Sequence, residues 1–259
     1  MKYAIRALGW ATAALWILVI LFSGTVVYSA MHIGFPELGK PTVTPLNGAM
    51  TISFPFSISN GGLYDISELN ITTFIAAENE TVSRSTTTVP LISIGDTVNK
   101  THDISVSLDD ILDKNLTYML FRDTNLSVNM FVALTYAQVI HLNISSSLGE
   151  ALYWGAPLNN LTIGEPSFTA IGDPPYNVTV PLSFENHAFF SLNGTIRLEI
   201  MDGNNLIGSK EENIPVPPRT RYDNAIFVMI ESVPSDMVEV HLYFNEVYIK
   251  SWTLVMAFG

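Results

Sequence analysis

One stretch of this sequence occurs twice. Residues 39–60 and residues 164–186 share glycine, proline and threonine near their starts, and proline, serine and asparagine near their ends. The two glycines lie 125 residues apart and the two asparagines 126, so one inserted residue aligns the copies. Solenoid repeats have periods of about 20 to 50 residues, so this longer period predicts two copies of one domain.

The repeated stretch ends, both times, in an alternating strand pattern. Apolar residues take every second position and mostly polar residues take the positions between, which is the pattern of a strand with one buried face. Pro55 and Pro181 stand among the outward positions and cannot donate to a ladder, so that side of each strand is predicted to lie at an edge or a bulge. The apolar positions are Ile52, Phe54, Phe56 and Ile58 in the first copy and Val178, Val180, Leu182 and Phe184 in the second.

Further strand patterns follow, so that each copy of the domain has about seven short strands, and each copy ends in a hairpin pattern (residues 126–145 and 238–257). In the first copy Ser107, with Asp110 three residues later, predicts one helical turn through Asp113. Short strands separated by regular turns are typical of an immunoglobulin-like or fibronectin III-like sandwich. The predicted fold class is therefore all-β, with two tandem β-sandwiches behind one N-terminal transmembrane α-helix.

The transmembrane prediction rests on residues 7–28, which include no charge in 22 positions. As a helix this segment would be about 33 Å long, enough to cross a hydrocarbon core of about 30 Å. Lys2 and Arg6 precede it and the next base is Lys40. The positive-inside bias then predicts a single-pass anchor in the cell membrane, with a cytoplasmic N-terminus and extracellular C-terminal domains.

Two other interpretations of this segment stay open. Val27-Tyr28-Ser29 before Ala30 is an acceptable signal-peptidase site, although the apolar run exceeds the roughly 7–15 residues of a signal core. A pilin-type leader is the other, because Arg6 and three small or apolar residues precede a hydrophobic helix; the acidic residue usual just inside such helices is missing. All three interpretations put the domains outside the cytoplasm.

The resulting organisation has six parts. They are a cytoplasmic tail (residues 1–6), a transmembrane helix (7–30), a stalk (31–39), a first β-sandwich (40–147), a linker (148–162) and a second β-sandwich (163–259).

Charge and cysteine content exclude some functions. Acidic residues outnumber basic ones 24 to 12, and all of the acids follow Arg6. This balance repels nucleic acid, and no basic patch with interleaved aromatics is present, so no nucleic-acid partner is expected. Without cysteine there are no disulfides and no thiolate metal sites. The expected partners are membrane lipid around residues 7–30 and, on the outside, an envelope protein or a second copy of the chain.

Asn-x-Ser/Thr sequons are more frequent than the composition explains. Nine are present, where the asparagine, serine and threonine content predicts about three. The excess favours an N-glycosylated surface, although threonine- and asparagine-rich strands also generate sequons by themselves. The candidate sites are Asn70, Asn79, Asn99, Asn115, Asn125, Asn143, Asn160, Asn177 and Asn193.

The sequence contains no pattern of a catalytic, cofactor-binding or metal site. The five histidines lack ligand spacing, and His102 beside Asp103 is expected on the surface. Asp109, Asp110 and Asp113 could bind calcium, but a helix cap is the favoured interpretation. No nucleophile elbow, phosphate-binding loop or dinucleotide glycine motif is present. The protein is therefore predicted not to be an enzyme and to need no cofactor.

Each copy has a proline-led first strand, an alternating strand that runs into asparagine, a proline-bearing approach and a further alternating strand. These features lie at residues 41–43, 54–60, Pro90 and 104–108 in the first copy, and at 166–168, 180–186, 215–218 and 226–230 in the second. This order of strands resembles the late embryogenesis abundant group 2 family, also called the water-stress and hypersensitive-response (WHy) domain family, over about 220 residues in two copies. The resemblance implies membrane-anchored or soluble non-enzymatic proteins associated with desiccation or stress protection, including archaeal and bacterial versions.

Three functions follow as hypotheses. The first is a membrane-anchored, non-enzymatic cell-surface protein whose sandwiches serve binding or envelope structure. The second is a subunit of an extracellular filament, in which residues 30–40 complete the sheet of a neighbour by strand addition. The third is stress protection, as the family resemblance implies.

Overall fold

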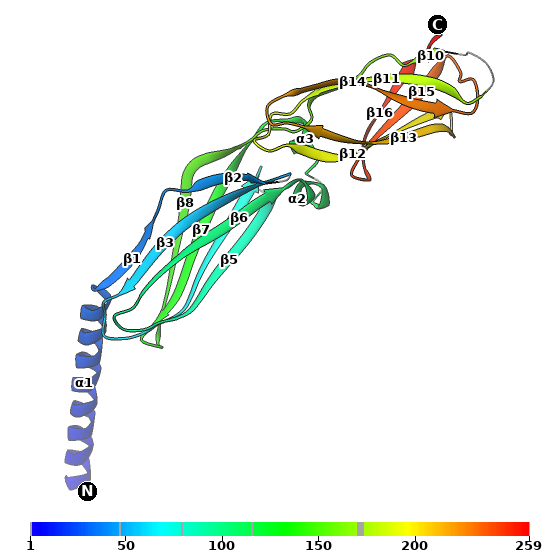
Figure 1. The fold of residues 1–259 in the computed structure, drawn as a ribbon. Coiled ribbons are helices and arrows are strands. Elements are labelled where there is room, and N and C mark those ends of the chain that lie inside the picture. Colours follow the sequence, from blue (N-terminus) through cyan, green and yellow to red (C-terminus); the bar gives the residue numbers. More distant parts are fainter. Residues whose placement is uncertain (1, 47, 79, 115, 170–173, 259) are drawn as a thin grey trace.

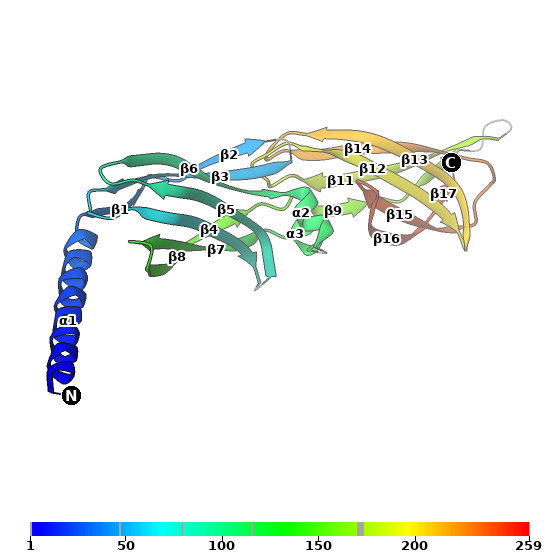
Figure 2. The ribbon, with the colours of Figure 1, turned by 90° about the horizontal axis from the view of Figure 1, so that it is seen from below.

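The protein consists of one long helix followed by two β-sandwiches in a row (Figure 1). This computed structural model describes residues 2–46, 48–78, 80–114, 116–169 and 174–258. In both views of the ribbon, α1 (Lys2–Ala30) leaves one end of the first sandwich and the second sandwich lies beyond the other end (Figure 2). The predicted all-β fold with an N-terminal apolar helix is confirmed.

Helix α1 is apolar around most of its circumference. Its residues from Arg6 to Thr25 are exposed, including Trp10 (79%) and Leu18 (64%). Apolar surface of this extent is unfavourable in water, and the described residues of the sandwiches leave most of it uncovered. Within the described residues, α1 is the one helix long and apolar enough to cross a membrane, from Arg6 to Ala30. Residues 2–6, predicted to be a tail, belong to the same helix.

Two four-stranded antiparallel sheets form the first sandwich. One sheet has the order β5-β4-β7-β8, and in the other β3 pairs with β6 on one side and with β1 and β2 on the other. Two short helices, α2 (Leu108–Asp113) and α3 (Tyr118–Phe121), connect β6 to β7. The strands are β1 (Ile33–Leu38), β2 (Thr42–Leu46), β3 (Ala49–Asn60), β4 (Ile66–Ala77), β5 (Glu80–Ile92), β6 (Thr97–Ser107), β7 (Thr124–Tyr136) and β8 (Ile140–Trp154).

The second sandwich repeats this arrangement. Strands β11 to β16 correspond in order to β3 to β8, with β16-β15-β12-β13 in one layer and β14-β11 in the other. A single pair, Gly208 with Ile230, joins β13 to β14, so the two layers belong to one nine-stranded sheet. β9 and β10 share the free side of β11 as β1 and β2 share that of β3. The strands are β9 (Asn159–Ile163), β10 (Ser167–Thr169), β11 (Tyr176–Glu185), β12 (Leu192–Asp202), β13 (Asn205–Val216), β14 (Arg221–Ile230), β15 (Met237–Phe244), β16 (Val247–Val255) and β17 (Ala257–Phe258).

The alternating patterns read from the sequence place the core. All eight apolar positions predicted in β3 and β11 are buried, and their side chains lie between the two layers of each sandwich because successive residues of a strand point to opposite faces. The same alternation in β6 and β14 supplies the neighbouring buried row. Each sandwich therefore has a core formed by side chains of both its layers.

The repeated glycine and proline are in contact with each other. β2 pairs with the part of β3 before Pro55 and β1 with the part after it, so the proline lies where the partner strand changes. Gly39 donates its N–H to the carbonyl oxygen of Pro55 at 2.8 Å, and a Cβ on Gly39 would lie 2.7 Å from Pro55 Cγ. Gly164 and Pro181 repeat the bond at 2.9 Å. The predicted irregularity at the strand edge is confirmed.

The stalk and the linker are shorter than predicted. Most of residues 31–39 form β1, because these residues pair with the end of β3 instead of standing free. β8 continues to Trp154, which pairs with Thr124 of β7, and β9 begins at Asn159. Residues 148–154 and 159–162 are thus strands, and the connection between the sandwiches is reduced to residues 155–158. Strand pairing, which satisfies backbone hydrogen bonds, extends each sandwich up to this connection.

Candidate functional site

The connection between the sandwiches is buried and hydrogen-bonded to both of them. Leu158 donates its N–H to the carbonyl oxygen of Leu120 in α3 at 2.8 Å, and His187, just after β11, donates its N–H to the carbonyl oxygen of Ala156 at 2.9 Å. A Cβ on Gly155 would lie 2.0 Å from the carbonyl oxygen of His187, so only glycine fits at this close approach. The connection is therefore a fixed joint rather than a free linker.

An ion-pair cluster lies on this joint. Nδ1 of His187 is 2.9 Å from a carboxylate oxygen of Asp123, which precedes β7 in the first sandwich, and Nε2 is 3.0 Å from the carboxylate of Glu185. Asp123 also accepts the N–H of Ala156 at 2.8 Å. The imidazole of the second sandwich is thus held between a carboxylate of each sandwich, with one third of its side chain exposed.

These contacts change the titration of both groups. Hydrogen bonds to Asp123 and then to Glu185 raise the pKa of His187 above its ordinary value of 6.5, although partial burial acts in the opposite direction. Burial acts to raise the pKa of Asp123, but hydrogen bonds from the Ala156 N–H and from His187 bring it below its ordinary value of 3.8. The contacts therefore favour a protonated His187 beside an ionised Asp123 carboxylate.

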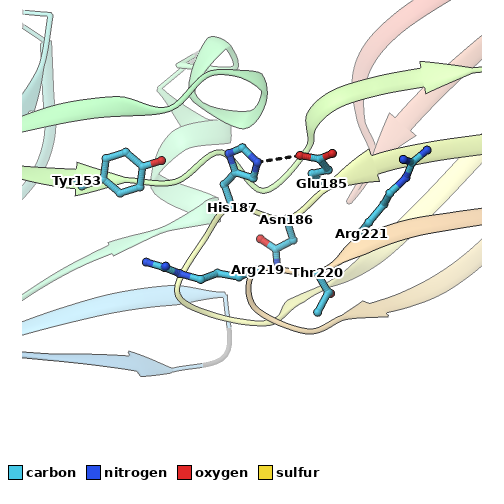
Figure 3. Close-up of a pocket in the computed structure, with 7 residues that line it drawn as sticks. All are labelled: Tyr153, Glu185, Asn186, His187, Arg219, Thr220 and Arg221. Carbon is cyan, nitrogen blue, oxygen red and sulfur yellow. Dashed lines mark hydrogen bonds and ion pairs between the residues drawn. The ribbon is translucent and has the colours of Figure 1, made fainter.

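A pocket of about 530 Å³ opens beside this cluster. Its walls come from the end of β8, from the turn after β11 and from the segment that leads into β14 (Figure 3). The guanidinium of Arg219 lies over the ring of Phe189 at 4.5 Å, and Arg221 donates to the hydroxyl of Ser183. The lining residues are Tyr153, Glu185, Asn186, His187, Arg219, Thr220 and Arg221.

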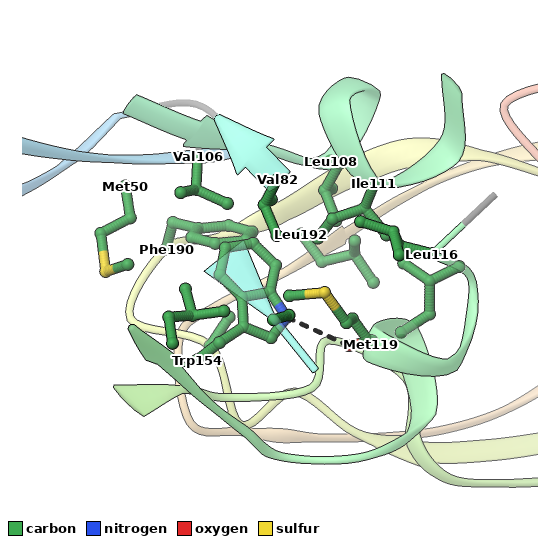
Figure 4. Packing of buried hydrophobic residues seen from close by; sticks show 14 of the residues in the cluster. Met50, Val82, Val106, Leu108, Ile111, Leu116, Met119, Trp154, Phe190 and Leu192 are labelled. Carbon is green, nitrogen blue, oxygen red and sulfur yellow. Dashed lines mark hydrogen bonds between the residues drawn. The ribbon is translucent and has the colours of Figure 1, made fainter. Parts of the chain in front are cut away.

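The pocket, which is lined by polar and charged residues, adjoins a continuous apolar contact between the sandwiches. Trp154 at the end of β8 is fully buried, donates its indole N–H to the carbonyl oxygen of Met119 at 3.0 Å, and lies 5.4 Å from the ring of Phe190 in the second sandwich. Figure 4 shows Leu192, also of the second sandwich, among side chains of the α2–α3 segment. The buried residues of both sandwiches form one cluster, so the joint is stabilised by packing as well as by hydrogen bonds.

The side chains of the pocket can donate and accept hydrogen bonds and bind a proton. Among the described residues no group of three or more His, Asp or Glu side chains is placed to hold a metal ion. The hydroxyl of Thr220, which lines the pocket, donates to the carbonyl oxygen of Pro217 at 2.8 Å, so it is not directed at a histidine. An arrangement of two arginines, a histidine and a carboxylate suits the binding of a small polar group.

The predicted glycosylation sites are spread over both sandwiches. Asn70 is half-buried, donates to the carbonyl oxygen of Glu68 at 3.0 Å and accepts from the hydroxyl of Thr88 at 2.7 Å. Asn79 and Asn115 lie outside the described residues. The six with exposed side chains are Asn99, Asn125, Asn143, Asn160, Asn177 and Asn193.

The acidic and histidine candidates have structural roles. Ser107 and Asp110 form a capping box at the start of α2: the serine side chain accepts the Asp110 N–H and the aspartate accepts the Ser107 N–H. The predicted helix cap is thus confirmed. The surface position predicted for His102 is wrong, because its ring is buried between the sheets and hydrogen-bonded to the hydroxyls of Thr73 and Thr87 at 2.9 and 2.8 Å.

Sequence reasoning missed the joint. His187 was visible only as a turn residue after a strand, and its partner Asp123 stands 64 residues earlier. The one available signal was the repeated pattern itself, which aligns His187 with Gly61 and so marks a position where the two copies differ.

A second junction joins α1 to the first sandwich. Ser29, in the last turn of the helix, is fully buried, and its hydroxyl bonds with the hydroxyl of Tyr136 and accepts the N–H of Leu63. One turn earlier Val26 is buried, and Thr25 bonds with the hydroxyl of Tyr64 at 2.8 Å. The helix therefore ends packed and hydrogen-bonded against the first sandwich rather than on a flexible tether.

Fold and junctions together define a tandem β-sandwich protein with an N-terminal apolar helix. No protein-family model matches the chain, and no curated protein matches it significantly. The family resemblance stated above stays a prediction.

Three solved structures illustrate what the chain is similar to. A bacterial adhesin from Mobiluncus mulieris shares 10% identity at a TM-score of 0.30, over 81% of this chain and 80% of the adhesin. Red sea bream transglutaminase shares 14% sequence identity at a TM-score of 0.29, over 86% of this chain and 31% of the enzyme. A glycosyl hydrolase family 2 member from Bacteroides cellulosilyticus shares 11% identity at a TM-score of 0.31, over 82% of this chain and 29% of the enzyme. The chain spans less than a third of the two enzymes, and at these scores the likeness carries no functional argument.

Proposed function

We propose that the protein is a single-pass, membrane-anchored cell-surface protein whose two β-sandwiches serve binding or envelope structure without catalysis. The observation that carries the proposal is the junction between α1 and the first sandwich. An exposed apolar helix of this length needs a lipid environment, and its last turn is built into the domain that follows.

The buried Ser29 favours an anchor over a signal peptide. Cleavage before Ala30 would remove the hydroxyl that bonds with Tyr136 and with the N–H of Leu63. It would also remove Val26, which is 4% exposed, and so uncover part of the core. Both losses destabilise the first sandwich, since buried polar groups need partners and apolar side chains need cover. In the proposed topology the helix is not cleaved, Arg6 lies on the cytoplasmic side and both sandwiches lie outside the cell.

A role in binding or envelope structure is supported by the fixed joint between the sandwiches. One apolar cluster runs through both sandwiches, and the joint adds hydrogen bonds and a shared ion-pair cluster. Such a unit holds its distal end away from the membrane at a defined position. The six exposed sequons support a glycosylated outer surface.

The two alternatives have less support. Strand addition needs residues 30–40 as a donor for another copy, but these residues form β1 and pair with β3 of the same chain. Stress protection rests on the family resemblance alone. Unchanged desiccation survival after deletion of the gene would exclude the stress role, and an assembly that grows with protein concentration would favour the filament.

The experiment that tests the proposal uses the full chain expressed in a membrane-bearing host. We expect the protein to stay in the membrane fraction after alkaline carbonate extraction, and mass spectrometry to find peptides that run through Ser29. Protease added to intact cells should cleave both sandwiches. A mature chain that starts at Ala30 and is released by carbonate would contradict the anchor.

The non-enzymatic part has a separate test. Purified full-length protein is assayed against a broad panel of ester, glycoside, peptide and phosphoester substrates. We expect no turnover above that of a preparation carrying Glu185→Gln and His187→Gln. Turnover that disappears in this double variant would show that the pocket is catalytic.

A further inference from the structure

Three loops close the end of the first sandwich that receives α1. They are residues 61–65 between β3 and β4, 93–96 between β5 and β6, and 137–139 between β7 and β8. Each presents one large apolar side chain to the outside: Leu63 is 53% exposed, Ile94 55% and Val139 60%. The β3–β4, β5–β6 and β7–β8 connections lie at the same end as the top of α1 (Figure 1).

Hydrogen bonds hold the three loops in one arrangement. The side chain of Asp65 accepts the N–H of Ile94 at 3.1 Å, and the carbonyl oxygen of Asp65 accepts the N–H of Ala137 at 3.2 Å. Leu63 donates its N–H to the hydroxyl of Ser29 in α1. The backbones of all three loops are therefore held relative to each other and to the helix.

The position of this end relative to the helix points to lipid. Val27 and Tyr28, on the face of α1 away from the sandwich, are 63% and 60% exposed, so the apolar surface of the helix continues up to the level where it meets the loops. Side chains anchored beside a membrane-crossing helix lie near the boundary between hydrocarbon and headgroups.

The charge of the loops decides how they could contact the bilayer. Residues 61–65, 93–96 and 137–139 include no lysine or arginine and two acids, Asp65 and Asp96. Attraction to anionic headgroups needs basic residues, so apolar insertion is the remaining contribution. Three separate side chains at one end also fit a plane better than they fit the groove of a protein partner.

We propose that Leu63, Ile94 and Val139 form a membrane-contact surface that inserts into the interface of the outer leaflet in which α1 is anchored. This rests on the proposed membrane anchor and deepens it. The sandwich is then held by four points, the helix and three loops, and its orientation to the bilayer is set. The distal sandwich is carried outward at a fixed angle as a result.

The test uses the absence of cysteine in the chain. Single variants Leu63→Cys, Ile94→Cys and Val139→Cys carry a nitroxide label in the full-length protein, reconstituted in phosphatidylcholine vesicles. Power-saturation electron paramagnetic resonance measures collision with oxygen, which concentrates in lipid, and with a water-soluble nickel chelate. Val233→Cys, in the β14–β15 loop at the distal end of the second sandwich and 57% exposed, is the matched control. Leu18→Cys in α1 reports whether the helix itself is in lipid.

We expect an oxygen-to-nickel collision ratio severalfold higher at all three loops than at Val233, and a still higher ratio at Leu18. Immersion of Leu18 with loop ratios equal to that of Val233 would overturn the contact surface and leave the anchor standing. A label at Leu18 that collides freely with nickel would overturn both proposals.

A second pair of variants excludes an effect of the label. In a protein that carries Leu63→Ser and Ile94→Ser, the oxygen-to-nickel collision ratio of a label at Val139→Cys should fall toward the ratio measured at Val233→Cys. The reason is that two of the three membrane contacts are gone. The matched background Val233→Ser, Met237→Ser changes two equally exposed side chains at the distal end and should leave it unchanged. An equal fall in both backgrounds would contradict the proposal.

Discussion

At the scale of single residues, two buried asparagines hold equivalent positions in the two sandwiches. Nδ2 of Asn60 donates to the carbonyl oxygens of Tyr64 and Ile92, both at 3.0 Å, and its Oδ1 accepts the N–H of Gly62. Asn186 makes the same kinds of bond to Phe190, Val216 and Ala188. Each amide joins the turn after one strand to the end of another, which gives the repeated asparagine its physical reason.

Replacing Asn60 with alanine should destabilise the first sandwich. The substitution leaves two carbonyl oxygens and one N–H without their partners in a buried site, at a cost of about 1–3 kcal/mol. Urea unfolding of the full chain, followed by tryptophan fluorescence and circular dichroism, measures this loss. Asn99→Ala in unglycosylated protein, where the side chain is exposed, should change stability little. Equal effects of the two substitutions would contradict the role of Asn60.

His187 should make the joint pH-dependent. Because its folded-state pKa is raised, the protonated form is stabilised on folding, fully below the unfolded-state pKa near 6.5 and progressively less as pH rises through the folded-state value. We expect wild type to exceed His187→Gln in unfolding free energy by less than about 1 kcal/mol at pH 5.5, and the difference to vanish at pH 8.5. In an Asp123→Asn background the pH dependence should shrink. A difference that grew with pH would have the wrong sign.

At the scale of elements, the sequence predicts those structures whose interacting residues lie close together along the chain. The capping box of α2 needs only four consecutive residues, and the turns after β12 and β15 form at Gly203 and at Asn245 and Glu246, all with positive φ. Helix α1 is also predictable from the sequence, since its apolar composition is continuous. The burial of its last turn is not predictable, because Ser29 is buried by residues more than 30 positions away.

The cap of α2 is open to a direct test. Ser107→Ala removes the acceptor of the Asp110 N–H and should cost about 1 kcal/mol, as loss of a helix N-cap usually does. Ser105→Ala, at an exposed position of β6 two residues earlier, is the matched control. The urea midpoints of the two variants give the comparison. Indistinguishable midpoints would show that the cap does not contribute.

At the scale of the whole molecule, the joint decides whether the protein is one body or two. The link of residues 155–158 is too short and too well bonded to act as a free hinge. Trp154 and Phe190 pack across it, so moving one sandwich against the other would open the apolar cluster. A rigid arrangement of two sandwiches on a seated helix follows.

Gly155→Ala should loosen this arrangement. Its Cβ would meet the carbonyl oxygen of His187 at 2.0 Å, so the link has to move and the bond between His187 and Ala156 is strained. Double electron–electron resonance between labels at Thr101→Cys and Thr253→Cys should give a narrow distance distribution in wild type and a broader or shifted one in the variant. Gly9→Ala, where a Cβ meets nothing within 4 Å, is the control. An unchanged distribution in Gly155→Ala would argue against a fixed joint.

The sequence by itself determined the fold class, the repeat and the apolar helix, because each is recorded in a local period or in composition. The alternation from Ile52 to Ile58, repeated from Val178 to Phe184, fixes which side chains face the core. Only the tertiary structure decided where β8 ends, that His187 pairs with Asp123, and that the hydroxyl of Ser29 bonds with that of Tyr136. These contacts join residues 64 and 107 positions apart, and they depend on how strands pair and stack rather than on any pattern along the chain.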